Sequence, residues 1–208
     1  MDSQFEMKRI LITGKTYPNP ARKGVEVSCV GGVTEGRWRY RRRKLDPSVS
    51  DSVQTFGRRQ AIQKYDEIEV MAKKARSDQR PESYQVDPDS ISVVRSMSSG
   101  GNKWNEVRER LLPLVSASMC VIQEQRKITR VTLGAFQPTG QIKLTIEATE
   151  TDWTPEQLQK LVNYGMFDKI PQSTLEKVPY KFVYHFNCGT SECNGHNISC
   201  IDWEMCQT

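Results

Sequence analysis

The sequence predicts an α+β protein built from a mainly β N-terminal unit, a helical and mixed middle, and a C-terminal hairpin tied by a metal ion. Three observations lead to this class. Apolar residues alternate in short runs over the first half, they recur at helical spacing in the middle, and four of the six cysteines fall in the last 21 residues. We expect the three parts to span residues 1–97, 98–170 and 171–208.

The N-terminal unit is expected to be a small antiparallel sheet, either curled or closed into a barrel. Residues 8–13 read as a first strand, and residues 25–29 alternate as a second strand that ends at a Gly-Gly pair. Residues 66–72 and 90–95 repeat the alternating pattern. The segment between them, residues 46–60, is rich in Ser, Asp and Gln and reads as a loop.

The middle begins with apolar residues at helical spacing. Pro113 interrupts this run and is expected to kink it or to divide it into two helices. Thr154 is a good helix cap, because Pro155 follows at the first helical position and Gln157 at the third. We expect that helix to end near residue 164. The apolar positions of the first run are Val107, Leu111, Leu114, Val115, Met119 and Ile122.

Four further strands are expected in the second half. Residues 130–136 and 141–148 read as a strand pair around a Pro-Thr-Gly turn. Residues 180–186 alternate aromatic and other side chains, and residues 198–205 alternate again. We expect these last two strands to form a hairpin that carries the cysteine-rich loop, residues 188–200, at its tip.

The loop at this tip has the composition of a metal site. It reads Cys188-x4-Cys193-x2-His196-x3-Cys200, with Cys206 as a competing fourth ligand if Cys200 points away. Zn²⁺ readily takes sets of three cysteines and one histidine, and a site with four protein ligands is structural because it leaves no position for substrate. The alternative is that these are incidental thiols beside a surface histidine. The two remaining cysteines are expected to be small buried residues: Cys29 and Cys120.

Short motifs give the sequence a wider resemblance. The loop is similar to a CCHC zinc knuckle in its density of ligands, but its spacing departs from that pattern, so the knuckle's reading of RNA does not carry over. Over most of its length the chain resembles an uncharacterised prokaryotic family, and this resemblance brings no activity with it. The matching segments are Lys15-Thr16-Tyr17-Pro18, Arg80-Pro81-Glu82-Ser83, and Cys188…Cys193-x-Gly195-His196…Asp202-Trp203-Glu204.

A strongly basic segment is the second functional signal, and it departs from the family pattern. Residues 37–59, expected to be a basic loop, hold eight basic and two acidic residues, against a net charge of +5 for the whole chain. Cations interleaved with aromatic rings suit the neutralisation of phosphates and the stacking of bases. The alternative is a solvated basic surface with its two aromatic residues in the core. The proposed contacts are Arg37, Trp38, Arg39, Tyr40, Arg41, Arg42, Arg43 and Lys44.

Together these features favour a non-catalytic nucleic-acid-binding or adaptor protein with structural zinc. One alternative is a nuclease or phosphoesterase in which Asp202 and Glu204 hold a divalent cation. A second alternative is a protein–protein scaffold. The longest uncharged apolar stretch, residues 111–122, is too short to span a membrane, and residues 1–8 lack the apolar run of a secretory signal. We therefore expect a cytoplasmic protein with nucleic acid as its main partner and no membrane contact.

Overall fold

The structure is a computed structural model, and it combines strands and helices as the sequence predicts. It describes residues 4–17, 19–20, 26–34, 37–44, 62–76, 78–97, 103–162 and 176–206. The strands of the N-terminal half are β1 (Glu6–Lys15), β2 (Asn19–Pro20), β3 (Glu26–Thr34), β4 (Arg37–Lys44), β5 (Asp66–Lys74), β6 (Ser83–Val86) and β7 (Ser92–Ser96). The elements that follow are α1 (Lys103–Leu111), β8 (Val115–Ser116), α2 (Met119–Thr129), β9 (Ala135–Phe136), β10 (Lys143–Ala148), α3 (Pro155–Val162), β11 (Tyr180–Phe186) and β12 (His196–Cys200). Short 3-10 helices span Pro88–Ser90, Leu112–Leu114 and Glu204–Cys206.

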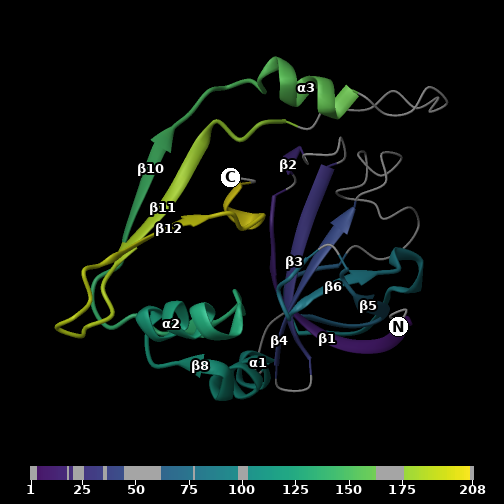
Figure 1. Cartoon of the computed structure of the whole chain (residues 1–208), viewed down its shortest axis with the longest axis horizontal. Coiled ribbons are helices and arrows are strands. Elements are labelled where there is room, and N and C mark those ends of the chain that lie inside the picture. Colours follow the sequence, from purple (N-terminus) through teal and green to yellow (C-terminus); the bar gives the residue numbers. More distant parts are fainter. Residues whose placement is uncertain are drawn as a thin grey trace.

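The N-terminal strands form one seven-stranded sheet that curls on itself. β1 pairs with β5 through its first half and with β3 through its second half. β3 pairs with β4, β4 with β6, and β6 with β5, so the pairings run in a ring of five strands (Figure 1). Each pair in this ring is antiparallel except β4–β6, which is parallel. We call these five strands the barrel, and they confirm the expectation of a curled N-terminal sheet.

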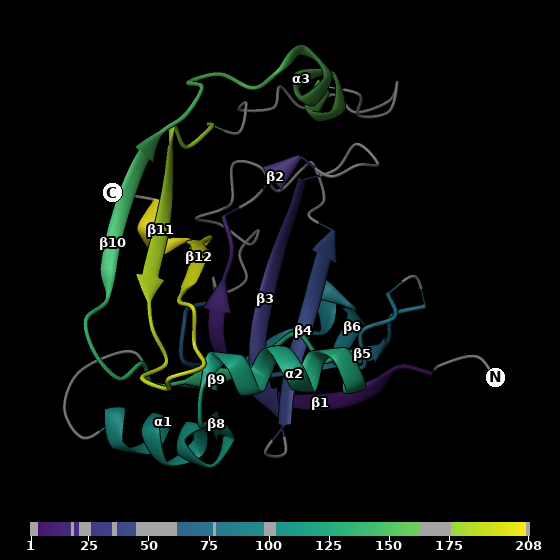
Figure 2. The same ribbon diagram turned by 60° about the vertical axis from the view of Figure 1, so that its left-hand side comes forward.

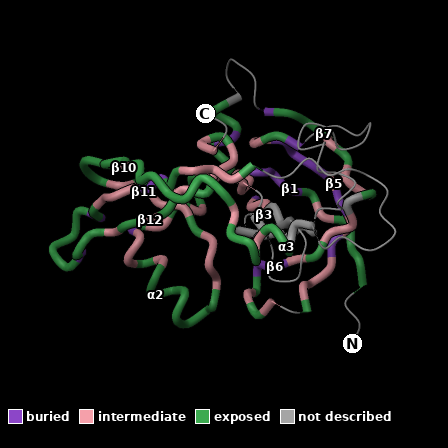
Figure 3. Tube along the Cα trace, turned by 90° about the horizontal axis from the view of Figure 1, so that it is seen from above, coloured by how far each residue is buried: buried purple, intermediate pink, exposed green. Residues whose placement is uncertain are grey.

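Buried aliphatic side chains fill the inside of the barrel. Ile10 and Ile12 of β1 pack with Ile68 and Val70 of β5, and Ile62 joins them from the preceding segment. Figure 3 shows buried stretches of the trace along β1 and β5. Alternation along each strand explains the pattern, because every second side chain of β1 and β5 faces inward.

One side of β1 also carries a second, smaller core. Leu11 points away from the barrel interior and packs with Met97 and with Val107 of α1. Strand β3 approaches β1 closely at Gly32, where an added Cβ would lie 2.6 Å from the carbonyl oxygen of Leu11. The sequence predicts that β3 ends at its Gly-Gly pair, but the strand continues to Thr34 because only glycine fits against β1 there.

The C-terminal half lies beside the barrel as a three-stranded antiparallel sheet with helices at both ends. The sheet has the order β10-β11-β12, and α2 and α3 lie near its two ends (Figures 1 and 2). β8 and β9 form a separate two-stranded parallel pair. Among the helices of the described ranges, none is long and apolar enough to cross a bilayer.

A contact between distant segments joins the two halves. The backbone N–H of Trp203 donates to the carbonyl oxygen of Lys15 at 2.8 Å, and Thr16 forms an isolated antiparallel bridge with Asp202. The ring of Trp203 stacks on Tyr17 with centroids 5.2 Å apart, and the Lys15 ammonium lies 4.8 Å from the Trp203 ring. We call the contact between residues 15–17 and 201–203 the terminal clasp.

Several local predictions hold and others need correction. Pro113 does divide the helical run, since α1 ends at Leu111 and α2 begins at Met119. Thr154 caps α3 reciprocally: its Oγ1 accepts from the Gln157 N–H at 3.3 Å, and the Gln157 Oε1 accepts from the Thr154 N–H at 3.0 Å. The expected end of this helix near residue 164 lies outside the described residues.

The strand predictions for the second half are partly wrong. The expected pair of residues 130–136 and 141–148 does not form, because β9 pairs with β8 and β10 pairs with β11. The last strand is also displaced: β12 spans His196–Cys200, and a 3-10 helix occupies Glu204–Cys206. The alternation around Trp203 reflects the terminal clasp instead of a continuing strand.

Candidate metal centre

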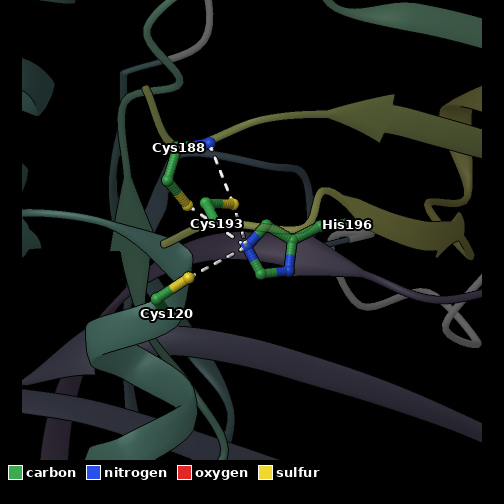
Figure 4. Close-up of side chains that lie close together, drawn as sticks. All are labelled: Cys120, Cys188, Cys193 and His196. Atoms are coloured by element: carbon green, nitrogen blue, oxygen red, sulfur yellow. Dashed lines mark hydrogen bonds between the residues drawn. The ribbon is translucent and has the colours of Figure 1, made fainter. Parts of the chain in front are cut away.

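Four sulfur and nitrogen donors converge where α2 meets the loop between β11 and β12. They are Cys120 from the first turn of α2, Cys188 and Cys193 from the loop, and His196 from the start of β12 (Figure 4). Their donor atoms all lie within 4.8 Å of one another. Cys188 and Cys193 are buried, and Cys120 and His196 are half-buried. The arrangement is a cluster of three cysteines and one histidine that is able to hold a metal ion.

The distances fit tetrahedral coordination. The Nε2 atom of His196 lies 3.2 Å from the Cys188 Sγ, 3.3 Å from the Cys193 Sγ and 3.4 Å from the Cys120 Sγ. With metal–sulfur and metal–nitrogen bonds of about 2.3 and 2.0 Å, tetrahedral geometry places sulfur and nitrogen about 3.5 Å apart. The four donors therefore surround a space of the right size for one ion, and all three sulfur atoms face the same ring nitrogen.

The backbone of the loop is shaped to bring its two cysteines together. Gly189 and Gly195 have φ values of +77° and +87°, a region that other residues rarely adopt. The Asn187 side chain accepts from the Gly189 N–H at 2.8 Å and donates to the Cys193 carbonyl at 3.0 Å. These bonds close the loop around the donors, which explains why two glycines flank the cysteines in the sequence.

Cys120 is the donor that sequence reasoning missed. The sequence predicts a small buried residue here, but Cys120 occupies the first turn of α2, two residues after the cap Ser118, whose Oγ accepts from the Val121 N–H at 3.2 Å. When a bound metal ion ionises such a thiol, the helix dipole and the free N–H groups at the N-terminus of the helix stabilise the negative charge that results. A cysteine in the first turn of a capped helix is the sequence signal that points to this role.

The metal-free thiols differ in their acidity. Burial, together with hydrogen bonds to the other two thiols, raises the pKa of Cys120 to about 11. The backbone N–H of Cys188 donates to the Cys193 Sγ at 3.4 Å, and this bond lowers the pKa of Cys193. Three thiolates this close repel one another, so the fully ionised set needs a cation at its centre.

The structure does not bring Cys200 into the cluster. Cys200 is the last residue of β12 and lies opposite Phe182 of β11. A strand rises about 3.3 Å per residue, so Cys200 lies about 13 Å along the strand from His196. Cys206, the other proposed ligand, lies in the last 3-10 helix, where burial raises its pKa. In the group of four, Cys120 stands where the sequence suggested Cys200.

The two carboxylates proposed for a nuclease share a lysine instead of facing an open space. The Lys64 Nζ lies 3.0 Å from the Asp202 Oδ2 and 2.7 Å from the Glu204 Oε2. Burial lowers the pKa of Lys64, but the hydrogen bonds that its ammonium group donates to Glu204 and Asp202 outweigh this effect and raise the pKa overall. An ammonium group thus stands between the two acids, and this geometry favours a structural ion pair.

The other histidine is held on both sides by neighbouring strands. The His185 Nε2 lies 2.7 Å from the Thr145 Oγ1, and its Nδ1 lies 2.7 Å from the Asn197 Oδ1. These three residues face the same side of the C-terminal sheet. The two hydrogen bonds give His185 a structural place in this sheet.

The first part of the basic segment is a strand and not a loop. Residues 37–44 form β4, which pairs along its whole length with β3 and at Tyr40 and Arg41 with β6. The side chains of the proposed contact residues lie outside the described part of the structure, as do residues 45–61.

Comparison with protein families divides the chain in two. A family model described as a domain of unknown function, DUF8758, matches residues 6–113, and a second, DUF8757, matches residues 115–208. The chain belongs to the DUF8758 family. These matches confirm the resemblance to an uncharacterised family. No curated protein and no solved structure matches the chain.

The family motifs lie at the boundary between the DUF8758 and DUF8757 parts. The terminal clasp joins the first and the last of them. The middle motif contributes Glu82, which is 1% exposed and whose Oε1 accepts from both the N–H and the Oγ1 of Thr132, each at 2.7 Å. All four cluster residues belong to the DUF8757 part, with Cys120 and His196 near its opposite ends. The motifs therefore join two halves that are built from distant segments.

Proposed function

We propose that the chain is a non-catalytic nucleic-acid-binding protein in which zinc has a structural role. The barrel would bind the phosphate backbone through β3 and β4, and the cluster of three cysteines and one histidine would hold the C-terminal half in shape. One observation carries the binding part of the proposal: the ring of strand pairings makes β4, the most basic of the described strands, the third strand of the barrel.

The order of the barrel strands supports a ligand face on β3 and β4. The five barrel strands, in chain order, are β1, β3, β4, β5 and β6, and they are numbered here from one to five. Around the barrel their order is 1-2-3-5-4, with the fourth strand paired back to the first and the third and fifth strands parallel. This is the order of the oligonucleotide/oligosaccharide-binding barrel, which binds its ligands on its second and third strands and the adjoining loops. The second and third strands here are β3 and β4, and the argument from them is one of fold analogy.

The sequence of these elements suits a polyanion. β4 reads Arg-Trp-Arg-Tyr-Arg-Arg-Arg-Lys, so it combines six cations with two aromatic residues. The loop between β5 and β6, which adjoins the same face in such barrels, contains Arg76, and it also contains Arg80, whose guanidinium is paired with Asp78 of the same loop. Binding of this kind depends mainly on phosphate contacts and on stacking, and it has little sequence preference.

Zinc is the ion that best suits the cluster. Three thiolates and one imidazole at tetrahedral spacing are a common zinc set, whereas Mg²⁺ and Ca²⁺ prefer oxygen ligands. Four protein donors leave no open position, so the ion would organise the chain and not activate water. It would link α2 to the loop between β11 and β12, which are far apart in the sequence.

A salt titration with a matched variant tests the binding proposal. Binding of a fluorescent single-stranded oligonucleotide is measured by anisotropy from low to physiological salt. The test variant changes Arg41, Arg42 and Arg43 to Ser, and the control variant changes Arg108, Arg126 and Lys127, which are exposed on α1 and α2, to Ser. Each single-strand phosphate contact contributes about 0.7 to the slope of log K against log salt, so the test variant should lose about 2 units of slope.

The control variant makes the result interpretable, because it removes the same charge from another surface. Equal loss in both variants would mean that net charge alone attracts the oligonucleotide. No binding by the unmodified protein at low salt would refute the proposal and would favour the protein–protein scaffold. Elemental analysis of the purified protein tests the zinc separately, with one equivalent per chain expected.

A further inference from the structure

Among the described residues, the outer edge of the C-terminal sheet has no partner strand. β10 pairs with β11 on one side, and within the described ranges no strand pairs with its other side. Figures 1 and 2 both show β10 at the outside of the molecule, away from the barrel. An edge strand of this kind presents unpaired N–H and C=O groups to any strand that can approach.

The ladder with β11 determines which backbone groups face outward. The Thr149 N–H donates to the Pro179 carbonyl at 2.8 Å, directly beyond the last paired residue of β10. Hydrogen-bonded pairs alternate along an antiparallel ladder, so Lys143, Thr145 and Glu147 direct their backbone groups toward β11. The N–H and C=O groups of Leu144 and Ile146 therefore point away from the sheet.

The same two residues expose apolar side chains. Leu144 is 39% exposed and Ile146 is 60% exposed. Tyr180, opposite Ala148 on the same face of the sheet, is 52% exposed. An edge that combines free backbone groups with exposed apolar side chains favours pairing with another strand.

We propose that β10 pairs antiparallel with β10 of a second copy of this chain, with Thr145 opposite Thr145 at the two-fold axis. Leu144 of one copy then lies opposite Ile146 of the other, and their outward N–H and C=O groups bond in both directions. Lys143 of one copy lies opposite Glu147 of the other, at both ends of the pair. The two sheets become one continuous six-stranded sheet with an isologous interface.

Charge complementarity selects both the occupant and the register. The sequence of β10 is Lys-Leu-Thr-Ile-Glu-Ala. In an antiparallel pair of two such strands, lysine faces glutamate only in the register that places Thr145 opposite Thr145. A shift by two residues keeps the backbone bonding but places Lys143 opposite Thr145 or Thr149, and the charge pairs are lost. Lys143 and Glu147 would form non-hydrogen-bonded pairs, in which facing side chains come closest. Glu147 also lies 3.6 Å from Lys181 of its own chain, which leaves it able to accept a second cation.

Charge reversal followed by rescue tests the pairing. The full-length, metal-loaded chain is examined by sedimentation velocity over a wide concentration range. We expect a reversible dimer, a dissociation constant at least tenfold weaker in K143E and in E147K, and recovery toward the unmodified value in the double variant. The exposed α2 residue Lys127 provides the control K127E, which makes the same charge change away from β10 and should leave dimerisation unchanged.

A backbone variant tests the edge independently. I146P removes one outward N–H group without removing a donor from the ladder to β11, so it should abolish the dimer while circular dichroism and bound metal stay unchanged. A chain that remains monomeric at every concentration would overturn the proposal. So would a dimer that is insensitive to I146P, or single charge variants that the double variant does not rescue. None of these readouts depends on nucleic-acid binding.

Discussion

Cys120, the fourth residue of the candidate metal centre, leads to a specific prediction about metal binding. Cys120 and Cys200 are both half-buried thiols in the C-terminal half, but only the Cys120 Sγ lies near His196 Nε2, at 3.4 Å. Cys120→Ser should therefore weaken metal binding, whereas Cys200→Ser should leave it unchanged. Each change replaces one sulfur atom by oxygen, so the two variants are closely matched.

The size of the effect follows from linkage between binding and folding. Loss of a residue that only orients a ligand commonly costs 10–100-fold in metal affinity, so we expect loss of a ligand itself to cost about 100-fold or more. With free zinc buffered at 100 times the dissociation constant of the unmodified protein, binding stabilises that protein by about 2.7 kcal/mol. The same zinc stabilises a variant with 100-fold weaker binding by about 0.4 kcal/mol. The difference of about 2.3 kcal/mol corresponds to roughly 5–9 °C in Tm for a chain of this size.

Thermal unfolding in zinc buffers, with and without a chelator, measures this difference. The unmodified protein and Cys200→Ser should both lose stability when the chelator removes zinc, and Cys120→Ser should respond much less. The geometry would be refuted if Cys200→Ser lost its metal while Cys120→Ser bound one equivalent with unchanged affinity.

Three further predictions concern the barrel, the clasp and the response to acid. Gly32→Ala places a Cβ 2.6 Å from the Leu11 carbonyl oxygen and should destabilise the fold by about 1–3 kcal/mol in urea unfolding. Trp203→Ala removes a stacked ring and a cation–π contact, about 1–2 kcal/mol together, and limited proteolysis should show earlier cleavage between the two halves. Burial opposes ionisation of Glu67, but Arg110 at 2.5 Å, with the nearby arginines of β1 and β7, holds the pKa of Glu67 below its usual value. Because the pKa of Glu67 is lower in the folded than in the unfolded chain, its ionised carboxylate stabilises the fold above about pH 4.3, and this stabilisation is lost as the pH falls. Glu67→Gln should therefore lose less stability than the unmodified protein between pH 5 and 3.

Each of these predictions has its own contradicting result. Unfolding of the Gly32 variant at unchanged urea concentration would mean that β1 and β3 lie further apart than described. Unchanged proteolysis of the Trp203 variant would show that Glu82 and the other contacts hold the halves without the clasp. A Glu67→Gln variant with the same acid response as the unmodified protein would assign the loss of stability to other carboxylates.

Local sequence determined much of the secondary structure. The cap of α3 was predicted because Thr154 and Gln157 are three residues apart and bond to each other's backbone. The break at Pro113 was predicted because proline lacks the N–H group that a helix needs at that point. The alternation in β3 and β5 indicated a curled sheet, since a strand with one buried face requires a partner layer.

Only the tertiary structure decided how distant segments meet. Cys120 joins His196 across 76 residues, and the parallel pairing of β4 with β6 links the basic strand to a segment 43 residues away. Spacing in the sequence favoured Cys200, but the extended backbone of β12 carries that thiol away from the loop. Contacts within a turn or a hairpin can be predicted from the local sequence pattern. Contacts between distant elements depend on how those elements pack, which the local pattern does not determine. The sequence therefore predicted a metal-binding tail and a basic segment, and the fold placed α2 at the candidate metal centre and made residues 37–44 a strand of the barrel.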